Sequence, residues 1–518
     1  MNSSLFEISP VPLEKHFEQA AIRRLSLCSC ANARDLISFE QASKLKVLPL
    51  RLVKAKSSEI LLVAAESDSD PKLEQTLKFL TNKTIELTLI ESNILNSAIF
   101  RSYFQNDQIL EMSAKELKGG KISIGSKSEP DRVSSPTAVP RFVSRLVEYA
   151  AAREASDIHI EPTKTGSIVK IRVDGMIYSH PEPICEKNLH DRIVAHIKTR
   201  SGMDTTQKYI PQDGGFQQQV GGYAINLRVS SMPTAYGEKI VLRTFGCRKL
   251  YRLADLELHP QALSLIEGFL AQSSGTALVV GPTGSGKTTL LYAILNRLRT
   301  QNANIVTIED PIELSIDGIV QTELKENLGL NYENALRAAM RQDPDILMVG
   351  EIRDSRAAQL VLQAGLTGHL VLSTLHSGNV FEALLRLSTL IPDAHVLPEV
   401  TSLIVAQRLI KKLCPECRSE AAKTRGVLPN DRTPLYFPTG CSNCHQSGYC
   451  GRVLATEVLK IDDELQDCLR TQGFDIKSLR GKVSRSNYLS FAESLYGPIQ
   501  TGDISLTDIP SEIFERNI

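Results

Sequence analysis

A glycine-rich segment near the middle of the chain constrains the fold more than any other part of the sequence. Residues 281–289 read Gly-Pro-Thr-Gly-Ser-Gly-Lys-Thr-Thr. The apolar run Thr276–Val280 comes before it, and apolar side chains recur at helical spacing from Leu290 onward. A glycine-rich loop between a buried strand and a helix, spelled G-x-x-x-x-G-K-[ST], is a phosphate-binding loop. The segment therefore predicts a nucleotide-binding domain of the α/β class.

The residue types in this loop match the chemistry of a bound nucleoside triphosphate. Glycines let backbone N–H groups close around phosphates at a helix N-terminus, whose partial positive charge favours anions. Lys287 is expected to reach the β- and γ-phosphates, and the Thr288 hydroxyl to bind Mg²⁺. The residues assigned to nucleotide binding are Gly281, Pro282, Thr283, Gly284, Ser285, Gly286, Lys287, Thr288 and Thr289.

Polar residues follow three further apolar runs. Glu309 follows the run 304–308, Glu351 follows Asp345–Gly350, and His376 follows 369–375. Apolar strands that alternate with helices indicate a parallel sheet covered on both faces. Ligands bind at the carboxyl ends of such strands. We therefore expect Glu309, Glu351 and His376 near the γ-phosphate.

Composition limits the class of protein. At 518 residues the chain is too long for one core, and two to four domains are expected. Lys+Arg and Asp+Glu both number 59, so no bulk attraction to nucleic acid is indicated. The sequence has no apolar run long enough to span a bilayer and no signal-peptide pattern at its start. We expect a cytoplasmic protein that reaches the membrane through partners.

The chain divides into six expected segments. An N-terminal partner-binding α/β domain precedes a linker rich in Gly, Ser, Lys and Pro, and a second small domain with four strand-like runs precedes the phosphate-binding domain. A cysteine module and a helical C-terminal segment complete the chain. The expected ranges are 1–112, 113–137, 138–250, 251–400, 401–455 and 456–518.

Four cysteines have the spacing of a metal site. Cys414 and Cys417 form one C-x-x-C pair, and Cys441 and Cys444 form a second pair after a gap of 23 residues. Four thiolates hold Zn²⁺ tetrahedrally with no position for water, so the predicted role is structural. His445 and Cys450 are possible substitute ligands, and four unligated thiols are the alternative.

Several motifs together resemble the secretion ATPase superfamily, in particular the type II secretion and type IV pilus assembly ATPases. They occur in order between about residues 138 and 460. The segments that carry the resemblance are Ala155–Pro162, Pro211–Gly214, Leu227–Thr234, Gly237-Glu238, 281–289, Glu309–Glu313, Gly350–Asp354, Gly368–His376, Gln407–Leu409, the two cysteine pairs and Gly451-Arg452.

The resemblance implies a fold and a set of roles. The fold is α/β and multidomain: a recombinase-A-like ATPase domain after smaller α/β domains, the second of them PAS-like, assembled as a homohexameric ring. Glu351 and Glu309 would organise Mg²⁺ and the attacking water, and His376 would sense the γ-phosphate. Arg228 and Arg243, on either side of the bend at 233–237, would complete the site from the second domain or a neighbouring subunit.

The sequence departs from the family pattern at several positions. Gly215 stands where arginine is usual, and Tyr209 where a basic residue is common. Residues 377–379 read Ser-Gly-Asn rather than Thr-Asn-Asp, and residues 1–110 lack the pattern of pilus ATPases that bind cyclic di-GMP. These differences do not affect the prediction of an ATPase. They do leave open which secretion or pilus assembly system the protein serves.

The favoured function is a hexameric ATPase that drives pilin or pseudopilin assembly from an inner-membrane platform. A DNA-translocating or conjugative ATPase of the same superfamily is one alternative, although the cysteine module and the neutral charge argue against it. A non-hydrolysing nucleotide-gated scaffold is another, although Lys287, Glu351 and His376 are all present. The expected cofactors are ATP, Mg²⁺ and Zn²⁺, and no direct nucleic-acid partner is expected.

Overall fold

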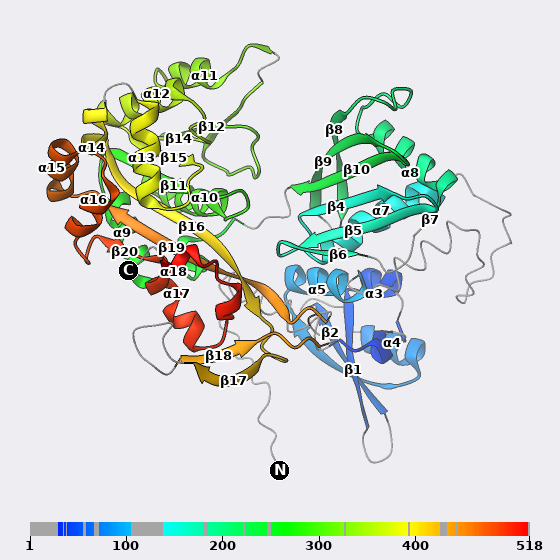
Figure 1. Cartoon of the computed structure of the whole chain (residues 1–518). Helices are drawn as coiled ribbons and strands as arrows, with labels where there is room; N and C mark the ends of the chain where they lie inside the picture. Colours follow the sequence, from blue (N-terminus) through cyan, green and yellow to red (C-terminus); the bar gives the residue numbers. More distant parts are fainter. Residues whose placement is uncertain are drawn as a thin grey trace. The chain divides into compact units, whose positions relative to one another are not determined.

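A computed structural model of the chain contains two compact units, Met1–Cys247 and Arg248–Ile518 (Figure 1). The structure describes residues 29–34, 36–37, 39–54, 59–66, 72–104, 138–179, 185–220, 223–245, 250–325, 328–391, 394–424, 433–441, 444 and 446–515. The predicted linker 113–137 and His445 lie outside this set. Each unit is described by itself below.

The first unit begins with a three-stranded sheet in the order β1-β2-β3. β1 runs antiparallel to β2, and β2 runs parallel to β3. Buried side chains of β2 pack with Leu48, Leu77 and Leu95 in one small core. The elements are α2 (Ala31–Arg34), α3 (Phe39–Leu45), β1 (Val47–Lys54), β2 (Glu59–Glu66), α4 (Leu73–Thr81), β3 (Thr84–Ile90) and α5 (Ser92–Phe104).

The second sheet of this unit has the order β6-β5-β4-β10-β9-β8, and β7 pairs with β5. The four strand-like runs of the sequence form β4, β5, β9 and β10. β8 was not expected, because its sequence is mostly polar or glycine and holds few of the β-branched and aromatic residues that indicate a strand. The elements are α7 (Ala138–Ala152), β4 (Asp157–Pro162), β5 (Gly166–Val173), β6 (Met176–Ser179), β7 (Cys185–Glu186), α8 (Lys187–Arg200), β8 (Gln212–Val220), β9 (Tyr223–Thr234) and β10 (Gly237–Phe245).

The two faces of this second sheet differ in chemistry. Ile158, Ile171 and Leu242 lie on one face and are buried in a core with residues of α7 and α8. Because side chains alternate along a strand, their neighbours Asp157, Arg172 and Arg243 lie on the opposite face. That face carries the arginines considered below.

The second unit is built on an eight-stranded sheet in the order β13-β12-β14-β15-β11-β16-β19-β20. The pairs from β13 to β16 are parallel, whereas β19 runs antiparallel to both of its neighbours. The strands are β11 (Gly275–Val280), β12 (Ile305–Glu309), β13 (Val320–Glu323), β14 (Ile346–Val349), β15 (Leu370–Leu375), β16 (Thr401–Leu413), β19 (Tyr449–Lys460) and β20 (Tyr488–Leu489).

Helices cover both faces of this sheet. Ala277 and Val279 of β11 pack in a core with α9 and α10 on one face, whereas Leu278 and Val280 pack with α12 and α13 on the other. This layered α/β arrangement confirms the predicted fold class. The main helices are α9 (Pro260–Leu270), α10 (Lys287–Leu298), α11 (Tyr332–Ala339), α12 (Ser355–Leu366) and α13 (Val380–Leu390).

The C-terminal helices pack on the same eight-stranded sheet, and the strands before and after the cysteine pairs are part of it. Leu465, Leu469 and Leu495 share a core with Ile404 of β16, as expected for a helical C-terminal segment that packs on the ATPase domain. β16 and most of β19 lie in the range predicted for the cysteine module, 401–455, but they hydrogen-bond into the main sheet. The remaining elements are α14 (Leu397–Val400), β17 (Ser419–Thr424), β18 (Thr433–Phe437), α15 (Asp463–Gln472), α16 (Ile476–Lys482), α17 (Phe491–Gln500) and α18 (Glu512–Glu515).

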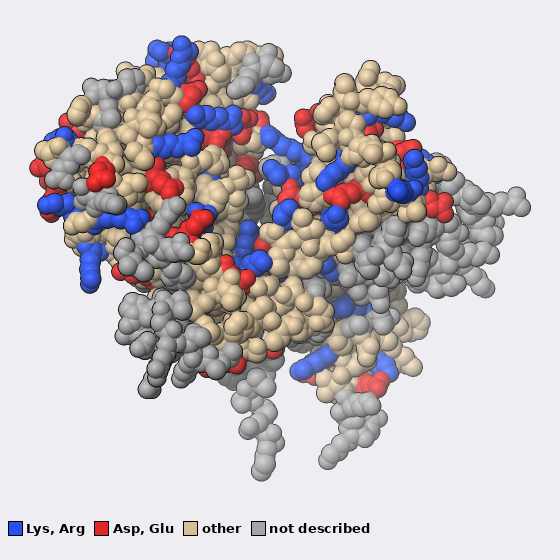
Figure 2. All heavy atoms as spheres, viewed as in Figure 1, with Lys and Arg blue, Asp and Glu red and all other residues tan. Residues whose placement is uncertain are grey.

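Two properties of the surface and the helices complete the description. On the face shown in Figure 2, Lys and Arg are interspersed with Asp and Glu, in keeping with their equal numbers. Among the described residues, no helix is both long and apolar enough to cross a membrane.

Candidate nucleotide site and metal centre

The phosphate-binding loop connects β11 to α10, as the sequence predicts. Gly286 immediately precedes α10 with φ of 93°, a left-handed conformation that glycine adopts without strain. Gly281 has no room for a side chain, because an added Cβ would lie 2.6 Å from the Gln407 carbonyl oxygen. Pro282, Thr283 and Gly284 are exposed. The loop therefore offers open backbone amides at the start of a twelve-residue helix, which fits a bound polyphosphate.

The amino group of Lys287 lies over this loop. Its Nζ donates to the carbonyl oxygens of Gly281 at 2.7 Å and Pro282 at 3.0 Å. Burial lowers the pKa of Lys287, and the negative charge of Glu351 opposes that shift. The acid after β14 is therefore close enough to Lys287 to act on its charge, as the strand order predicts.

Glu351 is the centre of a polar cluster at the carboxyl edge of the sheet. His376 Nε2 lies 3.3 Å from Glu351 Oε2. Arg353 pairs with the other carboxylate oxygen of Glu351 and also lies 3.3 Å from Asp310 Oδ2. The structure thus brings together Glu351, His376 and the lysine of the loop. Arg353 was not singled out in the sequence, although it lies inside the Gly350–Asp354 motif.

Glu309 lies at the end of β12 and is 4% exposed. Thr307 Oγ1 donates to its Oε1 at 2.6 Å, and Gln321 Nε2 donates to the same oxygen at 3.0 Å. The Tyr292 hydroxyl donates to Oε2. Sequence reasoning missed Tyr292, because a tyrosine among apolar residues in a helix gives no signal beyond a core position.

Tyr332 lies beside the same acids. Burial raises its pKa to about 12, and the charge of Arg353 opposes this shift while Glu351 and Asp310 add to it. The phenol therefore stays protonated at neutral pH. Its ring lies 5.8 Å from the Arg353 guanidinium, close enough for a cation–π contact.

Arg228 and Arg243 lie in the first unit, on the face of the second sheet opposite α7 and α8. They are direct partners across β9 and β10, so their side chains share this face. Asp157 is the next partner of Arg243, and Arg172 is the next partner of Asp157. Gly215 faces Arg228 on the other side. We call Arg172, Asp157, Arg243 and Arg228 the arginine row.

Asp157 is the buried member of the arginine row. Arg243 Nε donates to Asp157 Oδ1 at 2.9 Å, and Arg172 Nε lies 3.7 Å from Oδ2. Burial raises the pKa of Asp157, but the hydrogen bonds from Arg243 and Ser156 outweigh burial and hold the pKa below its ordinary value. The carboxylate therefore stays charged and orients the two guanidinium groups.

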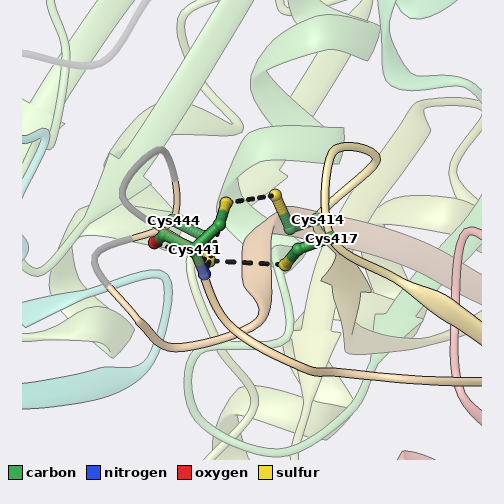
Figure 3. Close-up of side chains that lie close together, drawn as sticks. All are labelled: Cys414, Cys417, Cys441 and Cys444. Carbon is green, nitrogen blue, oxygen red and sulfur yellow. Dashed lines mark hydrogen bonds between the residues drawn. The ribbon is translucent and has the colours of Figure 1, made fainter.

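The four predicted zinc ligands form one cluster (Figure 3). The Sγ–Sγ distance is 3.9 Å between Cys414 and Cys441, and 3.7 Å from Cys444 to both Cys417 and Cys441. A tetrahedral Zn²⁺ with Zn–S bonds of about 2.3 Å requires sulfurs about 3.8 Å apart, whereas a disulfide requires about 2.05 Å. The thiols therefore fit a structural zinc ion. Cys450 is not part of this cluster.

Two backbone amides donate hydrogen bonds to one sulfur of this cluster. The amide of Gly448 donates to Cys444 Sγ at 3.1 Å, and the amide of Cys441 donates to the same sulfur at 3.2 Å. Such hydrogen bonds stabilise a thiolate, which is the form that binds metal.

Comparison with known proteins agrees with this geometry. Residues 133–496 match the family model of the Type II/IV secretion system protein. The chain is 40% identical over 373 residues to the type II secretion system protein HxcR of Pseudomonas aeruginosa, covering 72% of this chain and 76% of HxcR. It is 35% identical over 458 residues to the type IV pilus assembly ATPase PilB of the same organism, covering 86% of this chain and 80% of PilB.

A solved structure supports the same fold. The Legionella pneumophila ATPase DotB superposes with a TM-score of 0.58 at 24% identity, covering 76% of this chain and 98% of DotB. The family match spans the second sheet of the first unit, the phosphate-binding loop and both cysteine pairs. The chain therefore belongs to the type II/IV secretion system protein family, and its relatives include a type II secretion system protein and a type IV pilus assembly ATPase.

Proposed function

We propose that this protein hydrolyses ATP with Mg²⁺ and uses the energy to drive assembly of pilin or pseudopilin subunits. The observation that carries the proposal is the convergence of Lys287, Glu351 and His376 at the carboxyl edge of the sheet. The names of the relatives, a type II secretion protein and a pilus assembly ATPase, support the coupling to export.

Each residue has a distinct task in this proposal. Lys287 and the loop amides would hold the β- and γ-phosphates, and Thr288 would contribute a hydroxyl ligand to Mg²⁺, which would neutralise phosphate charge. Glu351 orients the attacking water and Glu309 supports the metal site, while His376 contacts the γ-phosphate. Thr288 lies in the first turn of α10, where its side chain remains partly exposed.

We propose that the arginine row adds positive charge at the transferring phosphates to that of Lys287 and Mg²⁺. Arg228 and Arg243 are exposed and share one face, so one anionic ligand can meet both. Planar guanidinium groups bind phosphate oxygens bidentately. We propose that they complete the ATP site across a subunit boundary of a homohexamer.

The same proposal places the protein in a larger machine. Residues 1–112 bind a partner, and assembly proteins of the inner-membrane platform recruit the hexamer from the cytoplasm. Zn²⁺ at the four cysteines has a structural role. On the face shown in Figure 2, the interspersed charge gives no support for a nucleic-acid track.

The central test is phosphate release by purified protein with Mg²⁺ and ATP. Lys287→Ala and Glu351→Gln should each reduce kcat by about 10² to 10³, because each removes a preorganised electrostatic contact. Glu420→Gln, in β17 of the same unit, is the matched control and should retain wild-type kcat. Wild-type turnover by either site variant would refute the assignment of the site.

A further inference from the structure

A buried tyrosine links the phosphate-binding helix to the acids at the strand ends. Tyr292 is in α10, five residues after Lys287, and is 5% exposed. Phosphate binding by the loop does not require a tyrosine at this buried position of α10. Its hydroxyl nevertheless requires a hydrogen-bond partner when it is buried.

The hydroxyl of Tyr292 makes two hydrogen bonds to one turn. It donates to Glu309 Oε2 and accepts from the backbone N–H of Glu313 at 3.1 Å. A phenol has one hydrogen to donate and lone pairs to accept, so both bonds form simultaneously. One oxygen atom thus connects α10 to both ends of the 309–313 turn.

The carboxylate of Glu309 depends on this contact. Its Oε1 accepts from Thr307 and Gln321, whereas Tyr292 is the donor to Oε2 among the described hydrogen bonds. A buried carboxylate oxygen without a donor is costly. Burial and the charge of Glu309 both raise the pKa of Tyr292, so the phenol remains a donor throughout the physiological range.

The turn held by Tyr292 is adjacent to the cluster around Glu351. The backbone N–H of Gly350 donates to the Ile308 carbonyl oxygen at 2.8 Å, which joins the ends of β12 and β14. Lys287 begins α10, and five residues of helix span about 7.5 Å. A few hydrogen-bonded residues therefore connect the start of α10, where the phosphates are expected to bind, to the acids at the ends of β12 and β14.

We propose that Tyr292 is a positioning residue for ATP hydrolysis. Its hydroxyl fixes the Glu309 carboxylate and the 309–313 turn relative to the lysine of the phosphate-binding loop, so that the acids and the phosphates keep one geometry. The inference rests on ATP hydrolysis, the enzymatic part of the proposed function, and does not depend on the machine that the protein serves.

The test removes a single oxygen atom. Tyr292→Phe in the full-length protein should lower kcat by about 10-fold to 100-fold, the typical effect of losing a supporting hydrogen bond. The KM for ATP and the Kd of a non-hydrolysable ATP analogue should stay within about twofold, since the loop itself is intact. Tyr449→Phe is the matched control, because Tyr449 donates its hydroxyl to Asp508 at 3.0 Å elsewhere in the unit, and it should keep wild-type kcat.

A second measurement does not depend on turnover. Amide hydrogen exchange at Glu313 should be about tenfold faster in Tyr292→Phe, and the protection of 309–313 that the ATP analogue induces in the wild type should disappear. Wild-type kcat together with wild-type exchange would overturn the proposal, as would a raised KM at unchanged kcat. A wild-type chain that hydrolyses no ATP would refute the proposed function, and the exchange result would then decide the Tyr292 link by itself.

Discussion

At the scale of single residues, the arginine row shows how a buried acid prepares an exposed cationic surface. Asp157 is 6% exposed, whereas the Arg243 side chain is 61% exposed even though its Nε is hydrogen-bonded. Holding one nitrogen of a guanidinium leaves its other donors free to meet a ligand and reduces the entropy lost when that ligand binds. The row is therefore preorganised for an anionic ligand.

Arg228→Ala and Arg243→Ala should still bind ATP but hydrolyse it more slowly, by about 10³ or more, since an arginine at the transferring phosphate is worth that much. Lys239→Ala is the control, because Lys239 lies on the same face of β10 and pairs with Glu161 at 2.7 Å. Mixing Lys287→Ala chains with Arg228→Ala chains should restore part of the activity. Full activity of either arginine variant would remove that residue from the site.

The pH dependence of stability should report on Asp157. Because its pKa in the folded protein is below the ordinary value of 3.8, its contribution is complete above that value and is lost as the pH falls through the folded pKa. Asp157→Asn should therefore lower the melting temperature at pH 7, and the difference from wild type should shrink toward pH 3. A difference that is independent of pH would contradict this account.

At the scale of elements, β16 and β19 connect the two sites of the second unit. β16 pairs with β11, the strand that leads into the phosphate-binding loop, and continues with β19 to the cysteine cluster. The amide of Cys414 donates to the Gly448 carbonyl oxygen at 2.9 Å, next to the last strand pair. A zinc ion held by the four cysteines would therefore close the open end of a two-stranded ribbon.

Purified protein should contain about one zinc ion per chain. Cys417→Ser should lose zinc and melt at a lower temperature, since metal binding to such a cluster is coupled to folding. Cys450→Ser should retain both, because Cys450 lies outside the cluster. Atomic emission and thermal unfolding measure the two effects, and full zinc in the double variant Cys414→Ser, Cys441→Ser would indicate other ligands.

Local sequence patterns predicted the elements better than the pairings between them. The phosphate-binding loop, the acids at the end of β12 and after β14, and the cysteine pairs were predictable because each depends on a few neighbouring residues. The pairing of Arg228 with Arg243 followed from the bend between their strands. The Tyr292 and Arg353 contacts and the strand β8 were not predictable, since they depend on long-range register and on which side chains meet in the folded core.

At the scale of the whole molecule, the balance of charge bears on which partners the proposed ATPase can act on. The chain has 59 basic and 59 acidic residues. We expect neither single-stranded nor double-stranded DNA to raise the ATPase rate, because a nucleic-acid track requires clustered positive charge. Phosphate release with and without DNA at low salt measures this. Stimulation above about twofold would favour the DNA-translocating alternative.

The ribbon of β16 and β19 has a mechanical consequence. The Gln407 carbonyl oxygen occupies the space that a side chain at Gly281 would need, and β16 continues from Gln407 to Leu413, which precedes Cys414. At about 3.3 Å per residue this stretch is about 20 Å long. A rotation of about 5° at Gln407 therefore displaces the far end by about 2 Å. With a metal ion at the four cysteines, the ribbon would convert a small rotation beside the phosphate-binding loop into a displacement that grows with the length of the strand.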